Sequence, residues 1–421
     1  MKGNDYVKLE LERSEFLKAW QIAEKYTGNK STMDSLEGVR ITAREDNTVT
    51  LEATDLKTSV KCTAKGVNVL EPGVAVLKAS TFGDMLKKTS AQTFTLETGD
   101  SRGLLNAGKS KSRFPVIPPE TFPNIPESGG AEDICTLQAS DLGRLINEGS
   151  AAASAPSDFP KYLGTCLLRT SDNIIMAVST DGKRLARSKR SCDPVQKKED
   201  LLLPSAATKD LAKIFTGDNN VKIRADGSTV WFCLEDSEFS VRRVEASFPN
   251  FERILNNDCK TSLKISRDEL IQALDRIDII AKNTPAHLMA MLLSPDGELR
   301  IIARAPEFGT ATETLEAHIE GENLQIGFNA AYFSDGLKAL GAGDVLIEFS
   351  SEEGQTRMLR AEGDDYLYML MPIRLTPQDL VSDDDPADFS APNQPEDDSQ
   401  DSPQAQEESY ESGDDSEGAP F

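Results

Sequence analysis

One stretch of the chain matches a nucleotide-binding motif at every required position. Residues 103–110 read GLLNAGKS, which fits the P-loop pattern G-x-x-x-x-G-K-[ST]. That chemistry needs a strand before the loop and a helix directly after it, whose N-terminus holds the phosphates. Residues 111–115 contain a proline and show no helical period of apolar residues, so we expect an extended chain there. A P-loop enzyme is therefore an alternative, but the sequence after the motif does not predict the helix that a P-loop requires.

Other residues capable of catalysis or metal binding are few. The two histidines, His287 and His318, fall on different predicted elements and lack ligand spacing. The cysteines are irregularly spaced without a C-x-x-C pair, so we interpret them as small buried hydrophobes in a reducing cytosol. We therefore expect no catalytic residue, no metal and no cofactor. The cysteines are Cys62, Cys135, Cys166, Cys192, Cys233 and Cys259.

The chain repeats itself at an interval of about 126 residues, and this repeat is more informative than any local motif. The pair Thr54 and Asp55 recurs as Thr180 and Asp181, and the tripeptide FPN at 122–124 recurs at 248–250. A unit of this length can bury its own core. We therefore predict three equivalent domains and a disordered acidic tail. The predicted bounds are 1–129, 130–257, 258–378 and, for the tail, 379–421.

Each repeat predicts an α+β unit in the order helix, strands, helix, strands. Ser14, Ser140 and Ser266 stand near the start of the first helix of each repeat. Ser266 and Glu269 also have capping-box spacing. Strands such as 173–178 follow. The second helices are predicted from the apolar sets Phe82, Met85 and Leu86; Leu211, Ile214 and Phe215; and Phe333, Leu337 and Leu340.

The formal net charge of −24 is unevenly distributed. Residues 381–421 contain 14 Asp and Glu and no Lys or Arg, too polar a composition to form a packed core. Without them, 56 acidic residues stand against 46 basic ones, which leaves a charge near −10. An acidic body argues against adhesive, salt-dependent DNA binding. It is compatible with a protein whose positive charge lies on one face.

The chain has no signal-peptide pattern at its N-terminus. No stretch approaches the roughly 18 apolar residues of a membrane helix. We therefore expect a soluble, cytoplasmic protein.

The predicted helices carry positive charge that the chain as a whole lacks. Lys18 and Lys25 lie on one face of the first helix, away from the stripe formed by Phe16 and Trp20. Taken singly, such residues are usually the solvated face of an amphipathic helix. Their recurrence in three repeats raises the alternative of a common surface that faces a polyanion. The other members are Lys87, Lys88, Arg144, Lys209, Lys213, Arg276 and Lys338.

Four segments together resemble the bacterial DNA polymerase III beta subunit, the replicative sliding clamp. They are 179–186, 248–251, 328–332 and 368–375. The resemblance covers residues 1 to about 376, with the segments in the right order and spacing. It implies a head-to-tail homodimeric ring of six similar domains, with helices lining the hole and sheets outside. The implied function is that of a non-enzymatic processivity factor, which encircles duplex DNA without reading its sequence.

The resemblance also implies a peptide-binding cleft between the second and third domains. There, the polymerase subunit, the clamp loader and repair factors would dock a short apolar motif. Flexible methionines suit such a surface, although 369–371 alone would more often be a core strand. Lys183, where the family often has histidine, and Gly164, where it often has asparagine, are departures that affect peptide preference. The implied walls are Tyr162, Leu163, Thr180, Gly182, Lys183, Arg184, Leu185, Pro249, Ile254, Met369, Leu370, Met371, Pro372, Ile373 and Arg374.

Two further sets of residues rest on the same resemblance. The apolar positions that match the family's subunit contacts are Phe114, Val116, Ile279 and Ile280. The positions that match its DNA contacts are Lys30, Lys161 and Tyr162. Within this class, the alternative is a ring-shaped paralogue, for drug resistance or phage-borne, that binds the same peptides.

Overall fold

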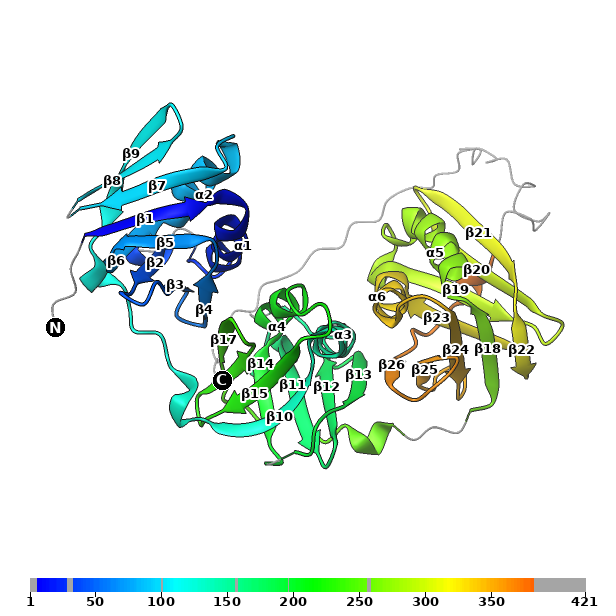
Figure 1. Cartoon of the computed structure of the whole chain (residues 1–421). Helices are drawn as coiled ribbons and strands as arrows, with labels where there is room; N and C mark the ends of the chain where they lie inside the picture. Colours follow the sequence, from blue (N-terminus) through cyan, green and yellow to red (C-terminus); the bar gives the residue numbers. More distant parts are fainter. Residues whose placement is uncertain are drawn as a thin grey trace, which may run out of the picture. The chain divides into compact units, whose positions relative to one another are not determined.

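The computed structural model describes residues 6–28, 33–99, 101–155, 158–195, 197–255 and 259–381. Residues 1–381 form one compact unit. The predicted tail, 379–421, lies outside the described residues from position 382 onward. This unit contains three α+β domains, each with two helices packed together on strands (Figure 1). The predicted fold class is thus confirmed, whereas the boundaries after 129 and 257 stay predictions.

In the first domain, α1 and α2 cover the sheet with a shared aromatic contact. Trp20 of α1 is fully buried, and its ring centroid lies 4.7 Å from that of Phe82 on α2. The Trp20 indole N–H also donates to the Ala79 carbonyl oxygen at 3.2 Å, so the buried donor is satisfied. The elements are β1 Val7–Glu12, α1 Arg13–Glu24, β2 Gly38–Ala43, β3 Val49–Thr54, β4 Thr58–Ala64, β5 Val67–Glu71, β6 Gly73–Lys78, α2 Ala79–Lys88, β7 Thr93–Thr98, β8 Arg102–Ala107 and β9 Ser110–Ile117.

In the second domain, a glycine allows the helices to approach closely. A Cβ atom at Gly143 of α3 would lie 2.3 Å from the carbonyl oxygen of Phe215. The predicted second helix ends earlier than expected, at Ala212, so Ile214 and the buried Phe215 follow it. The elements are β10 Glu132–Gln138, α3 Ala139–Gly149, β11 Thr165–Ser171, β12 Ile174–Thr180, β13 Arg184–Ser191, β14 Asp200–Pro204, α4 Ser205–Ala212, β15 Asn220–Ala225, β16 Thr229–Cys233 and β17 Ser237–Arg242.

In the third domain, α5 and α6 bury the apolar stripes that the sequence predicts. Leu270 and Leu274 of α5 and Phe333 and Leu337 of α6 lie in one hydrophobic core. The elements are β18 Thr261–Ser266, α5 Arg267–Ala281, β19 Leu288–Leu293, β20 Glu298–Ala305, β21 Gly309–Glu316, β22 His318–Gly321, β23 Leu324–Asn329, α6 Ala330–Leu340, β24 Asp344–Phe349, β25 Thr356–Arg360 and β26 Tyr366–Leu370. Of the helices in the described ranges, none combines the length and apolar character required to cross a bilayer.

Of the three serines near the starts of the first helices, only Ser266 occupies the N-cap position, and none makes a capping hydrogen bond. Ser14 and Ser140 lie inside α1 and α3, and Ser266 precedes α5 but makes no capping hydrogen bond. Each of these helices follows a strand without a loop, so a main-chain carbonyl of the neighbouring segment reaches the first helical N–H. The first N–H group of each helix is satisfied in this way rather than by a side chain. The bonds are Arg13 to Gln92 at 2.8 Å, Ala139 to Asn219 at 2.8 Å and Arg267 to Gly343 at 3.2 Å.

Strand pairing joins the three domains into continuous sheets. In the seam between domains 1 and 2, residues 58–62 of β4 pair antiparallel with 237–241 of β17. In the seam between domains 2 and 3, residues 184–188 of β13 pair with 366–370 of β26. The strands thereby form sheets of 13 and nine strands, beside a four-stranded sheet in domain 3. These ladders hold the two domains on either side of each seam together through main-chain hydrogen bonds.

Candidate functional site

The P-loop-like segment is a β-hairpin. Residues 103–107 lie on β8, Gly108 has a φ of 62° in the turn, and Ser110 begins β9. The expected extended chain is therefore present, and no helix follows the motif. The backbone N–H groups of the paired strands β8 and β9 donate to carbonyl oxygens in the ladder between them instead of forming a phosphate cradle. The P-loop alternative is wrong.

The two histidines lie apart and each is paired with one carboxylate. The His287 Nε2 atom lies 2.5 Å from Asp278 Oδ1, and His318 Nε2 lies 3.1 Å from Glu320 Oε1. Among the described residues, no group of three or more His, Cys, Asp or Glu side chains could hold a metal ion.

Cys62, Cys135 and Cys166 are buried as the sequence predicts, Cys192 and Cys233 are half-buried, and Cys259 departs from the prediction. Cys62 and Cys166 are buried, and burial raises the pKa of each thiol to about 12. A thiol that keeps its proton is a poor nucleophile. Cys259 is exposed, so the interpretation as a buried hydrophobe is wrong there, because it lies just before β18 rather than within the sheet.

An apolar groove lies along the seam between β13 and β26. Its volume is about 60 Å³. Leu185 and Met369, which are opposite each other in the strand ladder, are buried in its floor. Met371, at 48 % exposure, and Ile254 are exposed large hydrophobics that line the groove. The lining residues are Thr180, Gly182, Lys183, Arg184, Leu185, Ile254, Gln355, Met369, Leu370 and Met371. Gln355 was missed because it belongs to no motif and is brought in only by the start of β25.

A tight turn between β12 and β13 shapes one wall of the groove. Gly182 has a φ of 85°, a left-handed conformation that favours glycine. Its N–H donates to Thr180 Oγ1 at 3.1 Å, and this hydroxyl donates to the Arg184 carbonyl at 2.7 Å. The Lys183 N–H donates to Asp181 Oδ1 at 2.9 Å, while the Lys183 carbonyl accepts from the Met371 N–H at 3.0 Å. The turn and Met371 are thus held together by the main chain.

Arg184 is bound within the protein at the edge of this groove. Its guanidinium contacts Asp181 at 2.9 Å and Asp335 at 2.7 Å, and it lies 4.0 Å from the centroid of the Tyr332 ring. Burial acts to lower the pKa of Arg184, but hydrogen bonds to Tyr368, Asp335 and Asp181 raise it above its ordinary value. The guanidinium group is therefore satisfied by partners within the protein. A ligand in the groove can contact the aliphatic part of the Arg184 side chain.

Three predicted cleft residues flank the groove without lining it. Tyr162 packs edge-on against Phe248, with ring centroids 5.9 Å apart, and belongs to the apolar cluster that contains Leu185. Leu163 is half-buried beside it, and Pro249 is exposed. These residues extend the apolar surface from the groove toward domain 2.

The last three predicted cleft residues leave the groove after Met371. Pro372 and Ile373 are half-buried, and the Ile373 N–H donates to the Gly327 carbonyl at 2.7 Å, which directs the chain back onto domain 3. Arg374 is exposed, and its Nε lies 3.5 Å from Glu353. None of the three lines the described groove.

The predicted DNA-contacting residues lie at the surface, but several form ion pairs. The pairs of Lys18, Lys87 and Lys213 are at least partly exposed and contribute only about 0–1 kcal/mol each, so phosphates can replace their carboxylates, whereas Arg144 is paired with the buried Glu148. Lys25, Lys88, Lys161 and Lys209 are exposed and form no ion pair among the described residues. Lys30 lies outside the described residues. The ion pairs are Lys18 with Glu15 at 2.6 Å, Lys87 with Glu24 at 2.9 Å, Arg144 with Glu148 at 2.9 Å and Lys213 with Asp210 at 2.8 Å.

The predicted subunit-contact residues differ in exposure. Phe114 and Val116 on β9 are buried in their own domain, and the Phe114 ring centroid lies 5.6 Å from that of Phe82. Ile280 is half-buried against the third core, whereas Ile279 is 59 % exposed. Only Ile279 therefore presents a large apolar side chain to a partner.

The repeated domains, the strand-paired seams and the apolar groove define a clamp-type protein, a class that binds partners rather than transforming substrates. Family models cover nearly all of the described chain. The DNA polymerase III beta subunit N-terminal domain matches residues 7–126, its central domain 136–250 and its C-terminal domain 252–374. The chain belongs to the DNA polymerase III beta subunit family.

Relatives and solved structures agree with this assignment. The chain is 27 % identical over 369 residues to the beta sliding clamp of Pseudomonas putida, covering 87 % of this chain and 99 % of that one. It is 26 % identical to the Staphylococcus aureus beta sliding clamp over 375 residues, 86 % of this chain and 98 % of the relative. The Pseudomonas aeruginosa clamp bound to griselimycin superposes with a TM-score of 0.81 at 26 % identity, covering 88 % and 100 % of the two chains. A Bacillus subtilis clamp has the same fold, with a TM-score of 0.82, 22 % identity and the same coverage.

Proposed function

We propose that two copies of this chain close a head-to-tail ring around duplex DNA by pairing β9 of one copy with β21 of the other. As a member of its family, the chain is a sliding clamp, a processivity factor that binds DNA and polymerase partners and catalyses no reaction itself. We place the protein in the cytoplasm, where a clamp can reach chromosomal DNA.

The two seams inside the chain are formed by equivalent strands, and this observation supports the ring proposal. In each seam, the third strand after the first helix of one domain pairs with the last strand of the next domain: β4 with β17, and β13 with β26. The equivalent strands left over are β21 of domain 3 and β9 of domain 1. A third seam of the same kind can form only between two copies, which gives a closed ring of six domains.

Both leftover strands have free edges. In the described sheets, β21 has β20 as its one neighbour. β9 pairs with β8 along most of its length but with β6 only at Val116 and Ile117. Unpaired strand edges favour strand addition. Ile279 lies on α5, which packs against β21, so its exposed side chain is placed to be covered in the third seam.

The groove at the seam between domains 2 and 3 is our proposed docking site for short apolar motifs. Its floor is buried and preformed by β13 and β26, while Met371 and Ile254 at its surface can adapt to different side chains. A groove of about 60 Å³ accommodates one or two apolar side chains rather than a folded surface. This is consistent with a linear peptide as the partner.

Retention on DNA tests the ring. We expect the protein, loaded onto a circular plasmid, to stay bound and to leave when the plasmid is linearised, because encirclement needs no tight phosphate contact. Ile279→Glu should weaken dimerisation, measured by analytical ultracentrifugation, and shorten retention. Ile174→Glu, at a 38 % exposed isoleucine on β12, is the matched control and should do neither. Equal retention on circular and linear DNA contradicts the ring.

A further inference from the structure

A second hollow, about 240 Å³ in volume, lies at the seam between domains 1 and 2. Along β4, Val60 and Cys62 belong to the core that α1 covers, so Ser59 faces the opposite side of the sheet. Along β17, Val241 belongs to the same core, and Ser240 faces the opposite side. Both serines line the hollow. The hollow therefore opens on the face of the seam that is turned away from the helices.

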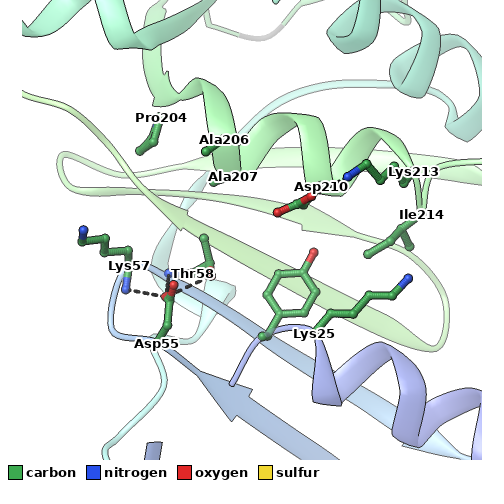
Figure 2. A pocket seen from close by; sticks show the side chains of 11 residues that line it. Lys25, Asp55, Lys57, Thr58, Pro204, Ala206, Ala207, Asp210, Lys213 and Ile214 are labelled. Atoms are coloured by element: carbon green, nitrogen blue, oxygen red, sulfur yellow. Dashed lines mark hydrogen bonds and ion pairs between the residues drawn. The ribbon is translucent and has the colours of Figure 1, made fainter. Parts of the chain in front are cut away.

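The turn that borders this hollow has the same hydrogen bonds as the turn of the apolar groove, which lies 126 residues later. The Leu56 N–H donates to Thr54 Oγ1 at 3.0 Å, and Asp55 Oδ1 accepts from the N–H groups of residues 57 and 58 (Figure 2). The Arg242 N–H donates to the Lys57 carbonyl oxygen at 2.8 Å. The equivalent donors at the apolar groove are the N–H groups of Gly182, Lys183, Arg184 and Met371. The hollow is therefore the counterpart of the apolar groove in the preceding seam.

The floors of the two sites differ in chemistry. Ser59 and Ser240 are opposite each other in the β4–β17 ladder, and their hydroxyl groups share a hydrogen bond. The apolar groove has Leu185 and Met369 in the equivalent pair. Because serine is smaller and polar, the hollow is larger than the groove, whose volume is about 60 Å³. A purely apolar motif would find no apolar floor in the hollow.

Two cations beside this floor lack an ionic partner. Lys57 and Arg242 both line the hollow, and the hydrogen bond between their main chains places the two residues side by side. Both are exposed and form no ion pair among the described residues. In Figure 2, the Lys57 side chain points away from Asp210 on the helix side of the seam. The described residues that line the hollow include no carboxylate. The hollow is therefore positively charged, although the protein as a whole is acidic.

An exposed leucine in a left-handed conformation adds an apolar surface beside the cations. Leu56 has a φ of 73° where the other turn has Gly182, and 52 % of its surface is exposed. This conformation is unfavourable for a bulky side chain, and such strain is concentrated at binding sites. Pro126 is a second exposed apolar residue of the lining, and its carbonyl oxygen accepts from the Trp231 indole N–H at 3.2 Å. A ligand in the hollow thus contacts two cations next to a small apolar rim.

We propose that this hollow docks a linear segment of a partner protein in which a glutamate or aspartate stands beside an apolar residue. The carboxylate pairs with Lys57 and Arg242, and the apolar side chain packs against Leu56 and Pro126. Charge complementarity identifies this occupant, because an anionic group neutralises both unpaired cations. Duplex DNA suits the hollow less well, since in the proposed ring the duplex passes on the helix side of the sheets.

Fluorescence anisotropy of a labelled peptide with the full-length protein tests this site at low salt, where exposed charges are least screened. The probe has the sequence GLEGS, and its matched partner, GLQGS, lacks the carboxylate. We expect saturable binding of GLEGS and about tenfold weaker binding of GLQGS. Arg242→Gln and Lys57→Gln should each weaken binding of GLEGS by a similar factor. Lys88→Gln, at an exposed lysine on α2 of the same domain, is the control and should bind GLEGS as the wild type does.

A third variant separates binding from stability. Leu56→Gly introduces the residue that stands in the equivalent turn and removes the apolar rim. It should weaken binding of GLEGS without lowering the melting temperature, because glycine adopts the left-handed conformation without strain. Unchanged binding in this variant contradicts the predicted contact with Leu56.

Several other results would overturn the proposal. They are absence of saturable binding at millimolar peptide, equal affinities for GLEGS and GLQGS, and unchanged affinity in both Arg242→Gln and Lys57→Gln. Displacement of GLEGS by a short apolar peptide from the polymerase would assign the probe to the apolar groove. Displacement by a duplex oligonucleotide would assign this face to DNA. None of these results depends on plasmid retention, so the ring is tested separately.

Discussion

At the residue scale, the groove separates side chains that support the fold from those that are free to bind. Leu185 and Met369 are almost fully buried in the ladder between domains 2 and 3, and Arg184 is committed to Asp181 and Asp335. Met371 is different because nearly half of its surface is exposed. A charge at Leu185 would disturb the seam itself, so a clean test of peptide binding has to be made at Met371.

We expect Met371→Glu to weaken binding of a short apolar peptide taken from the partner polymerase by at least tenfold. The peptide would bury an unpaired carboxylate, which costs about 2–5 kcal/mol. Fluorescence anisotropy of the labelled peptide measures the change. Leu70→Glu is the matched control, because Leu70 on β5 is also 48 % exposed but lies in domain 1. Loss of dimerisation with intact peptide binding in Met371→Glu would show that the groove was assigned wrongly.

At the scale of elements, a buried ionic cluster connects α3 of domain 2 with β25 of domain 3. Glu148 is almost fully buried and accepts hydrogen bonds from Arg190 at 2.7 Å and from Arg360 at 2.8 Å. Arg360 also contacts Asp365 at 3.0 Å. One carboxylate thus joins a helix of one domain to a strand of the next, beside the β13–β26 ladder.

Removing this carboxylate should destabilise the protein strongly. Glu148→Ala leaves Arg190, Arg360 and the more exposed Arg144 without this buried partner, and breaking a buried pair costs about 3–5 kcal/mol. Chemical denaturation of the variant measures the loss in free energy of unfolding. Glu353→Ala, at an exposed glutamate paired with Arg374, should change stability by less than about 1 kcal/mol. Equal effects of the two substitutions would mean that water, not Glu148, satisfies the arginines.

At the scale of the whole molecule, the threefold repeat explains how two copies can close a ring. The charge distribution explains how this ring can slide along DNA. Two seams inside the chain leave one free edge at each end, so association of two copies satisfies both edges at once. The exposed lysines lie on an acidic protein, and many already have carboxylate partners. Such a surface attracts phosphates weakly, which suits a ring that has to move along DNA.

The acidic C-terminal segment offers a further test at this scale. Residues 381–421 carry 14 acidic residues and no basic one, and a tethered segment acts at millimolar effective concentration. We expect truncation after residue 380 to tighten binding of an acidic or apolar partner peptide modestly, by about twofold at low salt, and the difference to shrink at high salt as charges are screened. Identical affinities with and without the segment at both salt concentrations would show that it has no role in binding.

The sequence alone determined the number of domains, their α+β character and the family, because these depend on patterns that recur along the chain. Apolar residues at helical spacing identify the faces of α1, α2 and α6, and a motif such as 179–186 is recognisable wherever it folds. The P-loop match was also correctly judged from local context, since the proline at 115 lies in β9. Sequence reasoning was weakest where a residue's partner lies far away along the chain.

Only the tertiary structure decided those cases. The first N–H groups of α1, α3 and α5 are satisfied by main-chain carbonyls far along the chain, so Ser266 makes no capping hydrogen bond although it occupies the N-cap position. Phe114 and Ile279 are both apolar, yet one fills the core and the other faces outward. Periodicity reports which face of an element is apolar, whereas burial and hydrogen-bond pairing depend on what the rest of the chain packs against that face.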